Sequence, residues 1–491
     1  MRATGRKARG TRVQRPRRGR PAGDGRTKRT REFLFRMTSD NGDDQVASDF
    51  LDRHAIDEVE CLVPDLAGIA RGKILPAQKF LKGMRETGLR IPEQIFIQTV
   101  TGDYGEDDGV TSPATIDVYL VPDVQTIRRV PWYDDPTAQV ICDAYYFDGA
   151  PVEIAPRRTL QRVLELFKAR GWTPVVAPEL EFFLVDVNTD PDYPLEPPIG
   201  RSGRRETARQ SYGVDAVNEF DPLFEEVYDF CEAQGIDIDT LTHESGAAQM
   251  EMNFNHGDPL ELADQTFLFK RTVRETAMRH KVYATFMAKP MENEPGSSMH
   301  IHQSVLDAKT GQNLFANKGD GENSRQFLAY IAGLQKYLPA VMPLLAPNVN
   351  SYRRLMRHSD APINTHWGLD NRTVGFRVPV SGAESRRVEN RCAGADCNPY
   401  LAMAASLACG YLGMVEELEP TKPVEGSGYR LAHTLPRTLY DALHRFSRSS
   451  GLKRVLGEDF VQVVTSVKDA ELEAYQRVIS SWEREHLLLN V

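Results

Sequence analysis

Alternating polar residues on several extended segments constrain what this chain can fold into. Successive side chains of a β-strand point to opposite faces, so residues two apart share a face. Four segments place acidic groups or imidazoles on one face, against apolar neighbours on the other. These residues are Glu179 and Glu181, then Glu251, then His300 and His302, and finally Glu389. Glu244 comes seven residues before Glu251, across a turn that contains glycine.

Polar faces of this kind are often solvated in half-buried strands. Here the opposite faces are strongly apolar, and the polar faces hold few of the Lys, Ser and Thr residues of a wet sheet. If the faces converge, two carboxylates about 4 Å apart repel by about 4 kcal/mol at an effective dielectric of about 20. Such a cluster needs a neutralising partner. Oxygen-rich ligation with His and without Cys predicts Mg²⁺ or Mn²⁺ rather than zinc.

A second constraint is the arginine-rich stretch 371–391, in a chain whose formal net charge is −9. Its five arginines are Arg372, Arg377, Arg386, Arg387 and Arg391. The alternation of Val374, Phe376 and Val378 predicts a strand, and a second strand follows at 387–391. Guanidinium groups bind phosphate and carboxylate well; a surface strand pair with solvated charge is the alternative. Metal ions beside guanidinium groups are typical of phosphoryl transfer.

The length of 491 residues predicts more than one domain, because single cores stop growing at roughly 250–300 residues. Residues 46–148 show short strands and turns, with a hairpin predicted from Val59–Val63 and Ala70–Ile74. From residue 149 to residue 491, helical and extended patterns alternate. We therefore predict an α+β protein with a small strand-rich first domain at 46–148 and a catalytic domain at 149–491.

Residues 1–45 are predicted to form a basic, disordered extension. Residues 1–36 carry 14 Lys or Arg against two acidic residues, and Gly and Pro are frequent. Such a segment buries too little apolar surface to order itself. It is a nucleic-acid-binding tail, a targeting peptide, or an extension of no function before a start at Met37, and we favour the last. No nucleic-acid partner is expected for the rest of the chain.

The six cysteines form no Cys-x-x-Cys pair, which is typical of reduced thiols and favours a cytoplasmic protein. The longest uncharged run, 398–415, is shorter than the roughly 20 apolar residues of a membrane span. Asn398 and Pro399 are a helix cap and a first helical residue. This run therefore predicts a buried helix and no membrane partner.

Seven motifs resemble, in order and spacing, those of the glutamine synthetase family. They are Pro-Glu-Leu-Glu-Phe-Phe-Leu (178–184), Glu-x-Gly-x-x-Gln-x-Glu (244–251), Gly-Ser-Ser-Met-His-Ile-His (296–302), Asn-Ser-Tyr-Arg-Arg-Leu (350–355), Asn-Arg-x-x-x-x-Arg-Val-Pro (371–379), Arg-Val-Glu-Asn-Arg (387–391) and Asn-Pro-Tyr (398–400). The resemblance implies a β-grasp first domain and a catalytic domain whose antiparallel strands form a funnel. ATP enters one end, glutamate enters the other, and two or more metal ions bind at the waist. It also implies a ring-shaped, dodecamer-like homo-oligomer with active sites between subunits.

The resemblance assigns a role to each matching residue. Glu181, Glu244 and Glu251 resemble the ligands of one metal, and Glu179, His300 and Glu389 those of the second. His302, Arg377 and Arg387 resemble ATP-binding residues, and Gly296, Arg354 and Arg391 resemble glutamate-binding residues. Arg372 resembles the residue that stabilises the phosphoryl group in transfer, and Asp360 stands at the offset of a catalytic acidic flap residue.

The implied reaction is the ATP-dependent joining of the glutamate γ-carboxylate to an amine through γ-glutamyl phosphate. The chain departs from the ammonium-using pattern where the amine binds. Asp360 stands where the family has Glu, Pro295 stands where Asn is expected, and the family's Asp-Gly-Ser-Ser loop is absent, with Asp103 as a candidate substitute for its Asp. These changes favour a larger amine such as putrescine, and so the γ-glutamylpolyamine synthetase branch. The alternatives are a true glutamine synthetase using ammonium and, more remotely, a non-catalytic nucleotide or metabolite sensor.

Overall fold

The computed structural model describes residues 42–86, 88–104, 109–207, 209–317, 322–357 and 360–491. Most of the expected extension, residues 1–41, lies outside these residues. Its predicted end at residue 45 is corrected, because helix α2 begins at Asp43. Asp43 and Asp44 lie in the first turn of this helix, where the helix dipole favours negative charge.

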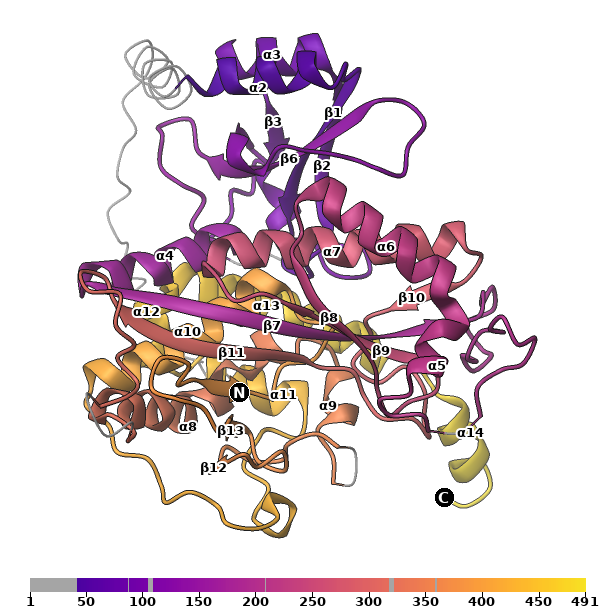
Figure 1. The fold of residues 1–491 in the computed structure, drawn as a ribbon, viewed down its shortest axis with the longest axis vertical. Coiled ribbons are helices and arrows are strands. Elements are labelled where there is room, and N and C mark those ends of the chain that lie inside the picture. The colour runs from indigo at the N-terminus through magenta and orange to yellow at the C-terminus, as the bar shows by residue number, and fades with distance from the viewer. Residues whose placement is uncertain (1–41, 87, 105–108, 208, 318–321, 358–359) are drawn as a thin grey trace, which may run out of the picture.

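The first domain is a mixed sheet with strand order β2-β1-β6-β4-β3, and β5 pairs with β6. Helices α2 and α3 lie at the top of this domain in Figure 1. Its elements are α2 (Asp43–Arg53), β1 (Glu58–Pro64), β2 (Ala70–Pro76), α3 (Ala77–Glu86), β3 (Arg90–Pro92), β4 (Asp117–Pro122), β5 (Arg128–Arg129) and β6 (Thr137–Tyr145). The predicted hairpin is confirmed, since β1 and β2 pair antiparallel from Glu58 to Pro64.

The part of the chain predicted to be the catalytic domain is built on a sheet of order β12-β13-β14-β11-β7-β9-β8, and β10 pairs with β7. All pairs are antiparallel except β12 with β13. Its strands are β7 (Trp172–Val185), β8 (Ile238–His243), β9 (Gln249–Phe254), β10 (Tyr283–Thr285), β11 (Met299–Asp307), β12 (Trp367–Leu369), β13 (Phe376–Val378) and β14 (Val388–Asn390). The predicted α+β class is therefore confirmed.

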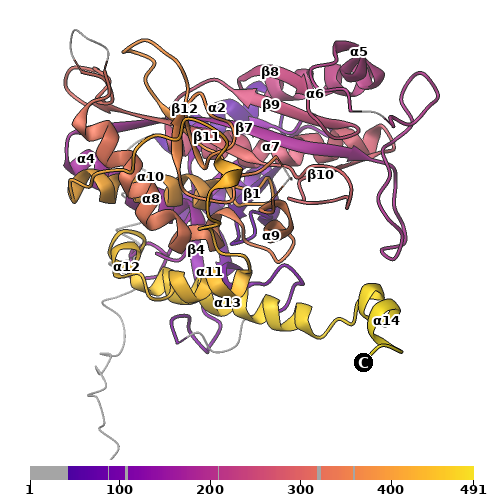
Figure 2. The same ribbon diagram turned by 90° about the horizontal axis from the view of Figure 1, so that it is seen from below.

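Helices cover one face of this sheet, and Figure 2 shows the strands above helices α8 and α10. The helices of the domain are α4 (Pro156–Ala169), α5 (Val214–Val217), α6 (Asp221–Gln234), α7 (Pro259–Arg279), α8 (Arg325–Leu345), α9 (Ser351–Arg354), α10 (Pro399–Val415), α11 (Leu439–Phe446), α12 (Ser450–Leu456), α13 (Glu458–Gln476) and α14 (Ser481–Leu487). Leu180, Met252 and Ile301 are completely buried on the covered face. Their polar strand neighbours consequently point to the opposite face.

The predicted buried helix is α10. The Asn398 side chain accepts hydrogen bonds from the backbone N–H groups of Tyr400 and Leu401, which begins the helix. Its Nδ2 donates to the Asp65 carbonyl at 2.8 Å, so the tip of the first-domain hairpin is held against the catalytic domain. Within the described ranges, every helix is too short or too polar to cross a membrane.

A buried ion network also joins the two domains. The Arg157 guanidinium donates to Asp123 at 2.6 Å and to Asp143 at 2.9 Å, both in the first domain. It also makes two hydrogen bonds with Asp264 of α7, at 3.0 and 2.9 Å. Removing one partner from a buried network of this kind leaves uncompensated charge, which is strongly unfavourable. The network therefore fixes the first domain relative to the helices under the catalytic sheet.

Candidate active site

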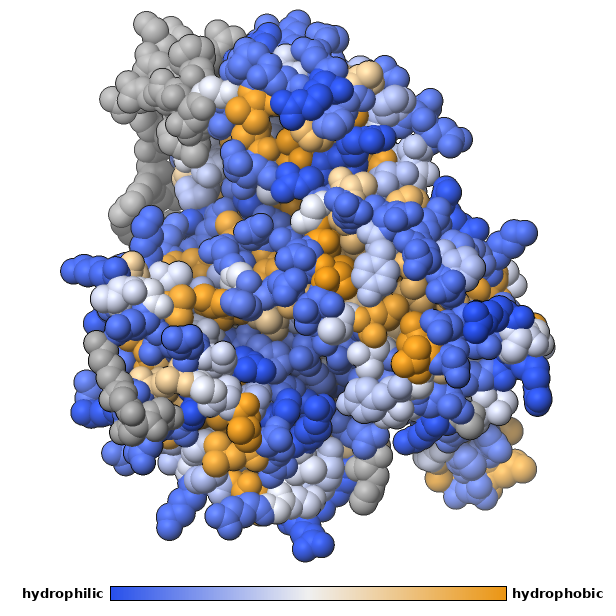
Figure 3. Space-filling model, in the orientation of Figure 1, coloured by the Kyte–Doolittle hydropathy of each residue, from blue (hydrophilic) through white to orange (hydrophobic). Residues whose placement is uncertain are grey.

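Two cavities lie next to each other on the exposed side of the sheet, and Glu179 and Asn253 line both. The larger has a volume of about 490 Å³, and its walls carry carboxylate, hydroxyl and guanidinium groups, including those of Glu181, Arg354 and Arg372. The smaller, of about 330 Å³, is lined by His302, Arg387 and the strand residues around them. The face shown in Figure 3 is largely hydrophilic. A two-ended arrangement with Glu179 at the junction agrees with the expected funnel.

Strand register brings the central acidic and imidazole groups together. Glu179 on β7 pairs with His300 on β11 and with Asn253 on β9. Glu389 on β14 pairs with His302 on β11. Directly paired residues of antiparallel strands have Cβ atoms about 4.5–5.5 Å apart. Segments that are distant in the sequence thus become neighbours.

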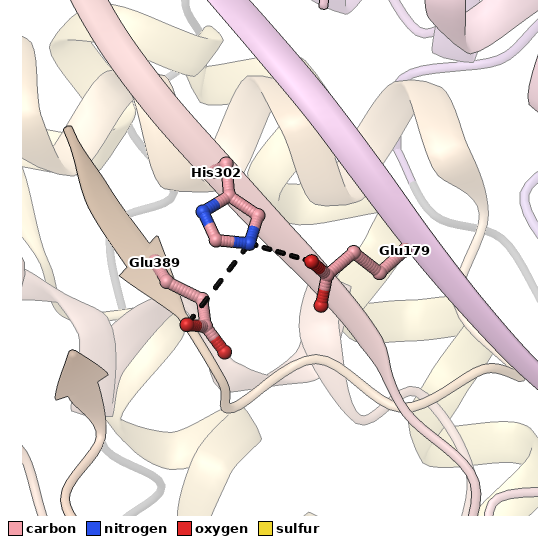
Figure 4. A group of neighbouring side chains, drawn as sticks. All are labelled: Glu179, His302 and Glu389. Carbon is pink, nitrogen blue, oxygen red and sulfur yellow. Dashed lines mark hydrogen bonds and ion pairs between the residues drawn. The ribbon is translucent and has the colours of Figure 1, made fainter. Parts of the chain in front are cut away.

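Glu179, His302 and Glu389 point toward one another from three strands (Figure 4). His302 Nε2 lies 2.8 Å from Glu179 Oε1 and 4.0 Å from Glu389 Oε2. His300 Nδ1 lies 3.3 Å from Glu179 Oε2 and 3.8 Å from Glu389 Oε1. Both imidazoles therefore lie between the same two carboxylates.

The geometry groups these residues differently from the sequence-based assignment. Potential ligand atoms of Glu179, His302 and Glu389 lie within 4.8 Å of one another, as do those of Glu179, Glu251 and His300. His302 was expected on the ATP side alone, and Glu251 in the set without Glu179. In this arrangement Glu179 is common to both groups, because it occupies the central strand between β9 and β11.

The remaining carboxylates lie beside the larger cavity. Glu181 accepts hydrogen bonds from the Ser298 backbone N–H at 2.8 Å and the Ser298 hydroxyl at 2.5 Å. It pairs with Glu251 across β7 and β9, and Glu244 lines the same cavity. Ser298 was not singled out from the sequence, although it lies within the Gly-Ser-Ser motif.

The electrostatics of these carboxylates fit a divalent cation. Burial raises the pKa of Glu244 to about 7, and the charge of Glu181 adds to the effect. Burial and then Glu179, Glu181 and Glu244 raise the pKa of Glu251 well above its usual value. The nearby protein cations therefore do not fully compensate this cluster. Carboxylate oxygens with imidazole nitrogen suit Mg²⁺ or Mn²⁺, which would supply the missing positive charge.

The pKa of Glu389, in contrast to those of Glu244 and Glu251, is lowered. Burial disfavours its charge, but Arg391 and the imidazoles of His300 and His302 outweigh burial and lower its pKa to about 2. Arg377 Nη1 donates to Glu389 Oε2 at 2.8 Å, and Arg391 also donates to this carboxylate. Glu389 is therefore ionised and held between the arginines and the central imidazoles.

The arginines divide between the two cavities. Arg354, Arg372, Arg377 and Arg391 line the larger cavity, while Arg387 lines the smaller and donates from Nε to His302 Nδ1 at 3.2 Å. Nε of Arg391 is buried without a hydrogen-bond partner among the residues that the structure describes. Arg386 points elsewhere and bonds to Asn323 and Ser381. The larger cavity thus offers several guanidinium groups to an anion.

Gly296 lies against Arg354 in this cavity. A Cβ added to Gly296 would lie 2.5 Å from the Ala288 carbonyl oxygen and 2.6 Å from Arg354 Cγ. The Gly296 carbonyl accepts a hydrogen bond from Gln249 at 3.1 Å. The absence of a side chain is what allows the backbone at 296 to approach the arginine.

The predicted amine-side residues are separated by the fold. Asp360 and Pro295 line the larger cavity. Asp103 instead lies in a loop whose Val100 N–H donates to Glu471 of α13 at 2.8 Å, and it lines neither of the two cavities. Two further cavity residues, Tyr212 and Tyr429, had no recognisable sequence signal because neither lies in a polar-faced strand.

Comparison with known proteins supports a family assignment. The family described as "Glutamine synthetase, catalytic domain" matches residues 153–487. The chain is similar to γ-glutamylputrescine synthetase PuuA of Escherichia coli K12, with 37% identity over 438 residues that cover 88% of this chain and 92% of that protein. It is also similar to the glutamate–isopropylamine ligase of a Pseudomonas species, with 32% identity over 452 residues that cover 89% and 95% of the two chains. The solved structure of GmaS without ligand aligns with a TM-score of 0.76 at 28% identity, covering 89% of this chain and 98% of that one.

We predict that Mn²⁺ binds the metal-free protein more tightly at pH 8 than at pH 6. Groups with a raised pKa hold protons at pH 6, and a cation must displace those protons. Because the pKa of Glu244 is about 7, affinity rises through this range and levels off above it. Titration calorimetry in two buffers of different ionisation enthalpy measures both affinity and proton release. Glu244→Gln should weaken the pH dependence, whereas the exposed control Glu232→Gln should not; equal affinities at pH 6 and pH 8 would contradict the prediction.

Proposed function

The chain belongs to the glutamine synthetase family, and we propose that it is an ATP-dependent ligase that joins the glutamate γ-carboxylate to an amine. A polyamine such as putrescine is favoured over ammonium. The observation that carries this proposal is the junction of two cavities at a carboxylate and imidazole cluster shared through Glu179. The smaller cavity is assigned to the nucleotide, and the larger cavity is assigned to glutamate and the amine.

The proposed reaction has two steps. A carboxylate is a poor acyl donor because its leaving group would be oxide, so a γ-carboxylate oxygen first attacks the γ-phosphorus of ATP and ADP leaves. The amine nitrogen then attacks the acyl carbon of γ-glutamyl phosphate, and inorganic phosphate leaves as the amide forms. Each step places negative charge where fixed positive groups stabilise it.

The metal proposal assigns two or more divalent cations to the carboxylates and imidazoles between the cavities. The proposed ligands are Glu179, Glu181, Glu244, Glu251, His300 and Glu389, with His302 added by its position beside Glu179. Mg²⁺ or Mn²⁺ bound there would neutralise phosphate charge during transfer. The protein itself holds Glu389 ionised and keeps Glu181 oriented through Ser298.

The substrate proposal follows the division of the arginines. Arg354 and Arg391, both buried in the larger cavity, are assigned to the glutamate carboxylate beside Gly296. Arg372 is assigned to the phosphoryl group in transfer. Arg387 and His302 of the smaller cavity are assigned to the phosphates of ATP, together with Arg377, which reaches Glu389 from the larger cavity. A guanidinium group can bind two carboxylate or phosphate oxygens at once, which suits these tasks.

The amine proposal rests on the composition of the larger cavity and on the relatives. Asp360 lies at its edge with a side chain 67% exposed, so it can meet an incoming cation. The relative with 37% identity is named for putrescine, and another is named for isopropylamine. Both names describe amines that carry carbon, which favours a primary alkyl amine over ammonium here.

We predict that putrescine supports phosphate release with glutamate and ATP at a higher kcat/KM than ammonium does. An amine panel that includes ammonium, putrescine and isopropylamine tests this with one phosphate assay. Glu181→Ala should abolish activity with every amine, because it removes a proposed ligand and the partner of Ser298. A panel in which ammonium alone is a substrate would replace this proposal with glutamine synthetase activity. Turnover by Glu181→Ala would contradict the metal assignment.

We predict that Gly296→Ala raises the KM for glutamate by roughly tenfold or more, since the new methyl group must displace Arg354 or the Ala288 backbone. The KM for ATP should change much less, because ATP is assigned to the other cavity. Gly382→Ala is the matched control, since a Cβ there would meet no atom within 4 Å. Equal changes in the two KM values would mean that Gly296 has a general structural role.

The protein is also proposed to form a homo-oligomer and to be located in the cytoplasm. The C-terminal segment 478–491 exposes Val478, Ile479, Trp482, Leu488, Leu489 and Val491 by 60% or more. Helix α14 lies apart from the body of the protein beyond the end of α13 (Figure 2). A second copy of the chain is the proposed partner of this segment, in a ring-shaped homo-oligomer of a dodecamer-like kind. The six free, buried cysteines suit the reducing cytoplasm.

We predict that the double variant Leu488→Asp, Leu489→Asp has a lower molecular mass in solution than the unaltered protein. The side chains are 75% and 91% exposed in the single chain, so the substitutions leave the monomer fold intact while placing charge in the proposed contact. Light scattering after size exclusion gives the mass. Tyr193→Asp, at another exposed apolar residue, is the control. An unchanged assembly in the double variant would exclude this segment from the contact.

A further inference from the structure

We propose that Tyr429, which lines the larger cavity, determines amine specificity by packing its ring against the alkyl chain of a primary amine. This inference rests on the proposed function and deepens it, by naming a residue that distinguishes alkyl amines from ammonium. Tyr429 lies in a short 3₁₀ turn, η4 (Gly428–Arg430), far along the chain from the catalytic strands. It nevertheless lines the cavity that contains Arg354, Asp360 and Arg372.

The turn that carries Tyr429 is held firmly against the arginine-rich segment. The Gly428 N–H donates to Thr373 Oγ1 at 2.7 Å, and Asn364 Nδ2 donates to the Gly428 carbonyl at 2.9 Å. The Tyr429 carbonyl accepts a hydrogen bond from Arg357 at 3.1 Å. A Cβ on Gly428 would lie 2.9 Å from Val374 Cγ1, so this contact is tight. The backbone therefore presents Tyr429 to the cavity from a fixed position.

The charges around Tyr429 place it between two proposed subsites. Burial raises the pKa of its hydroxyl; the Asp360 carboxylate adds to this effect, and Arg391 and Arg354 oppose it. The hydroxyl is consequently neutral in the physiological range. Tyr429 thus lines the same cavity as the acidic flap residue Asp360 and the arginines assigned to glutamate.

Few residues of the cavity offer apolar surface. Its lining is dominated by carboxylate, guanidinium, amide and hydroxyl groups. The side chains with substantial carbon surface are Tyr212, Pro295, Ala361 and Tyr429. An aromatic ring presents a large, rigid apolar face at a small entropic cost, since only two side-chain torsions are fixed. The turn that carries Tyr429 is hydrogen-bonded through Gly428 to Thr373, the neighbour of Arg372.

The physical basis of selection is the burial of methylene groups. Each methylene removed from water contributes about a fourfold factor in binding. Ammonium has no carbon surface and therefore gains no binding free energy from contact with the Tyr429 ring. The affinity for a longer alkyl amine increases with every carbon that contacts the ring. Contact of this kind therefore raises kcat/KM with chain length.

The test is the dependence of kcat/KM on chain length for ammonium, methylamine, ethylamine, propylamine and butylamine. In the unaltered enzyme we expect a rise of about threefold to fourfold per methylene over this series. Tyr429→Phe keeps the ring and should keep this slope. Tyr429→Ala removes the ring and should reduce the slope to less than about twofold per methylene. Tyr440→Ala, at an exposed tyrosine of α11, is the matched control and should keep the slope.

The outcomes separate the inference from the proposed function. If the unaltered enzyme uses ammonium alone, the proposed function fails. The unaltered enzyme can use alkyl amines while Tyr429→Ala keeps the slope, or lowers kcat/KM for all amines by one common factor. In either case the specificity role of Tyr429 is overturned and the proposed function stands. A slope lost in Tyr429→Ala and restored in Tyr429→Phe supports the inference, because a merely structural role would not depend on amine length.

Discussion

The arrangement of charge across three antiparallel strands is the constraint on which the rest of the structure depends. Glu179, His302 and Glu389 come from β7, β11 and β14, and the pairing of these strands places their side chains together. Arg377 and Arg391 balance the charge of Glu389. On the β9 side, burial and then the neighbouring carboxylates raise the pKa values of Glu244 and Glu251. The Glu389 end therefore has protein cations beside its carboxylate, whereas among the described residues the β9 side lacks nearby protein cations of this kind.

Such a cluster needs a rigid support, because a one-residue slip of a strand would turn its polar side chains toward the core. The apolar residues that alternate with the site, such as Leu180 and Ile301, are completely buried under helices and fix the register. The long strands β7 and β11 pair from Met299 with Leu180 to Asp307 with Trp172. Core packing and site geometry are therefore specified by the same strands, one on each face.

Much of the site could be predicted from the sequence because period-two alternation assigns each residue to a face. This placed Glu179 with Glu181 and His300 with His302, and the family resemblance supplied the roles. The proximity of Glu179 to both His302 and Glu251 was not predicted, since alternation says nothing about which strand lies in the centre. The role of Asp103 stays a prediction: within the single chain it lies on a loop bound to α13, and the resemblance implies active sites between subunits. Tyr429 was missed because a turn residue carries no periodic signal.

The sequence by itself determined the α+β class, the buried helix at 398–415 and the types of group in the site. These features follow from local rules of alternation, capping and composition. Only the tertiary structure decided that Glu179 lies beside both His302 and Glu251, that Arg387 and Arg354 line different cavities, and that Tyr429 and Asp360 line the same one. The physical reason is that these relations join segments distant in the chain, and strand order and domain packing, which local patterns do not encode, bring such segments together.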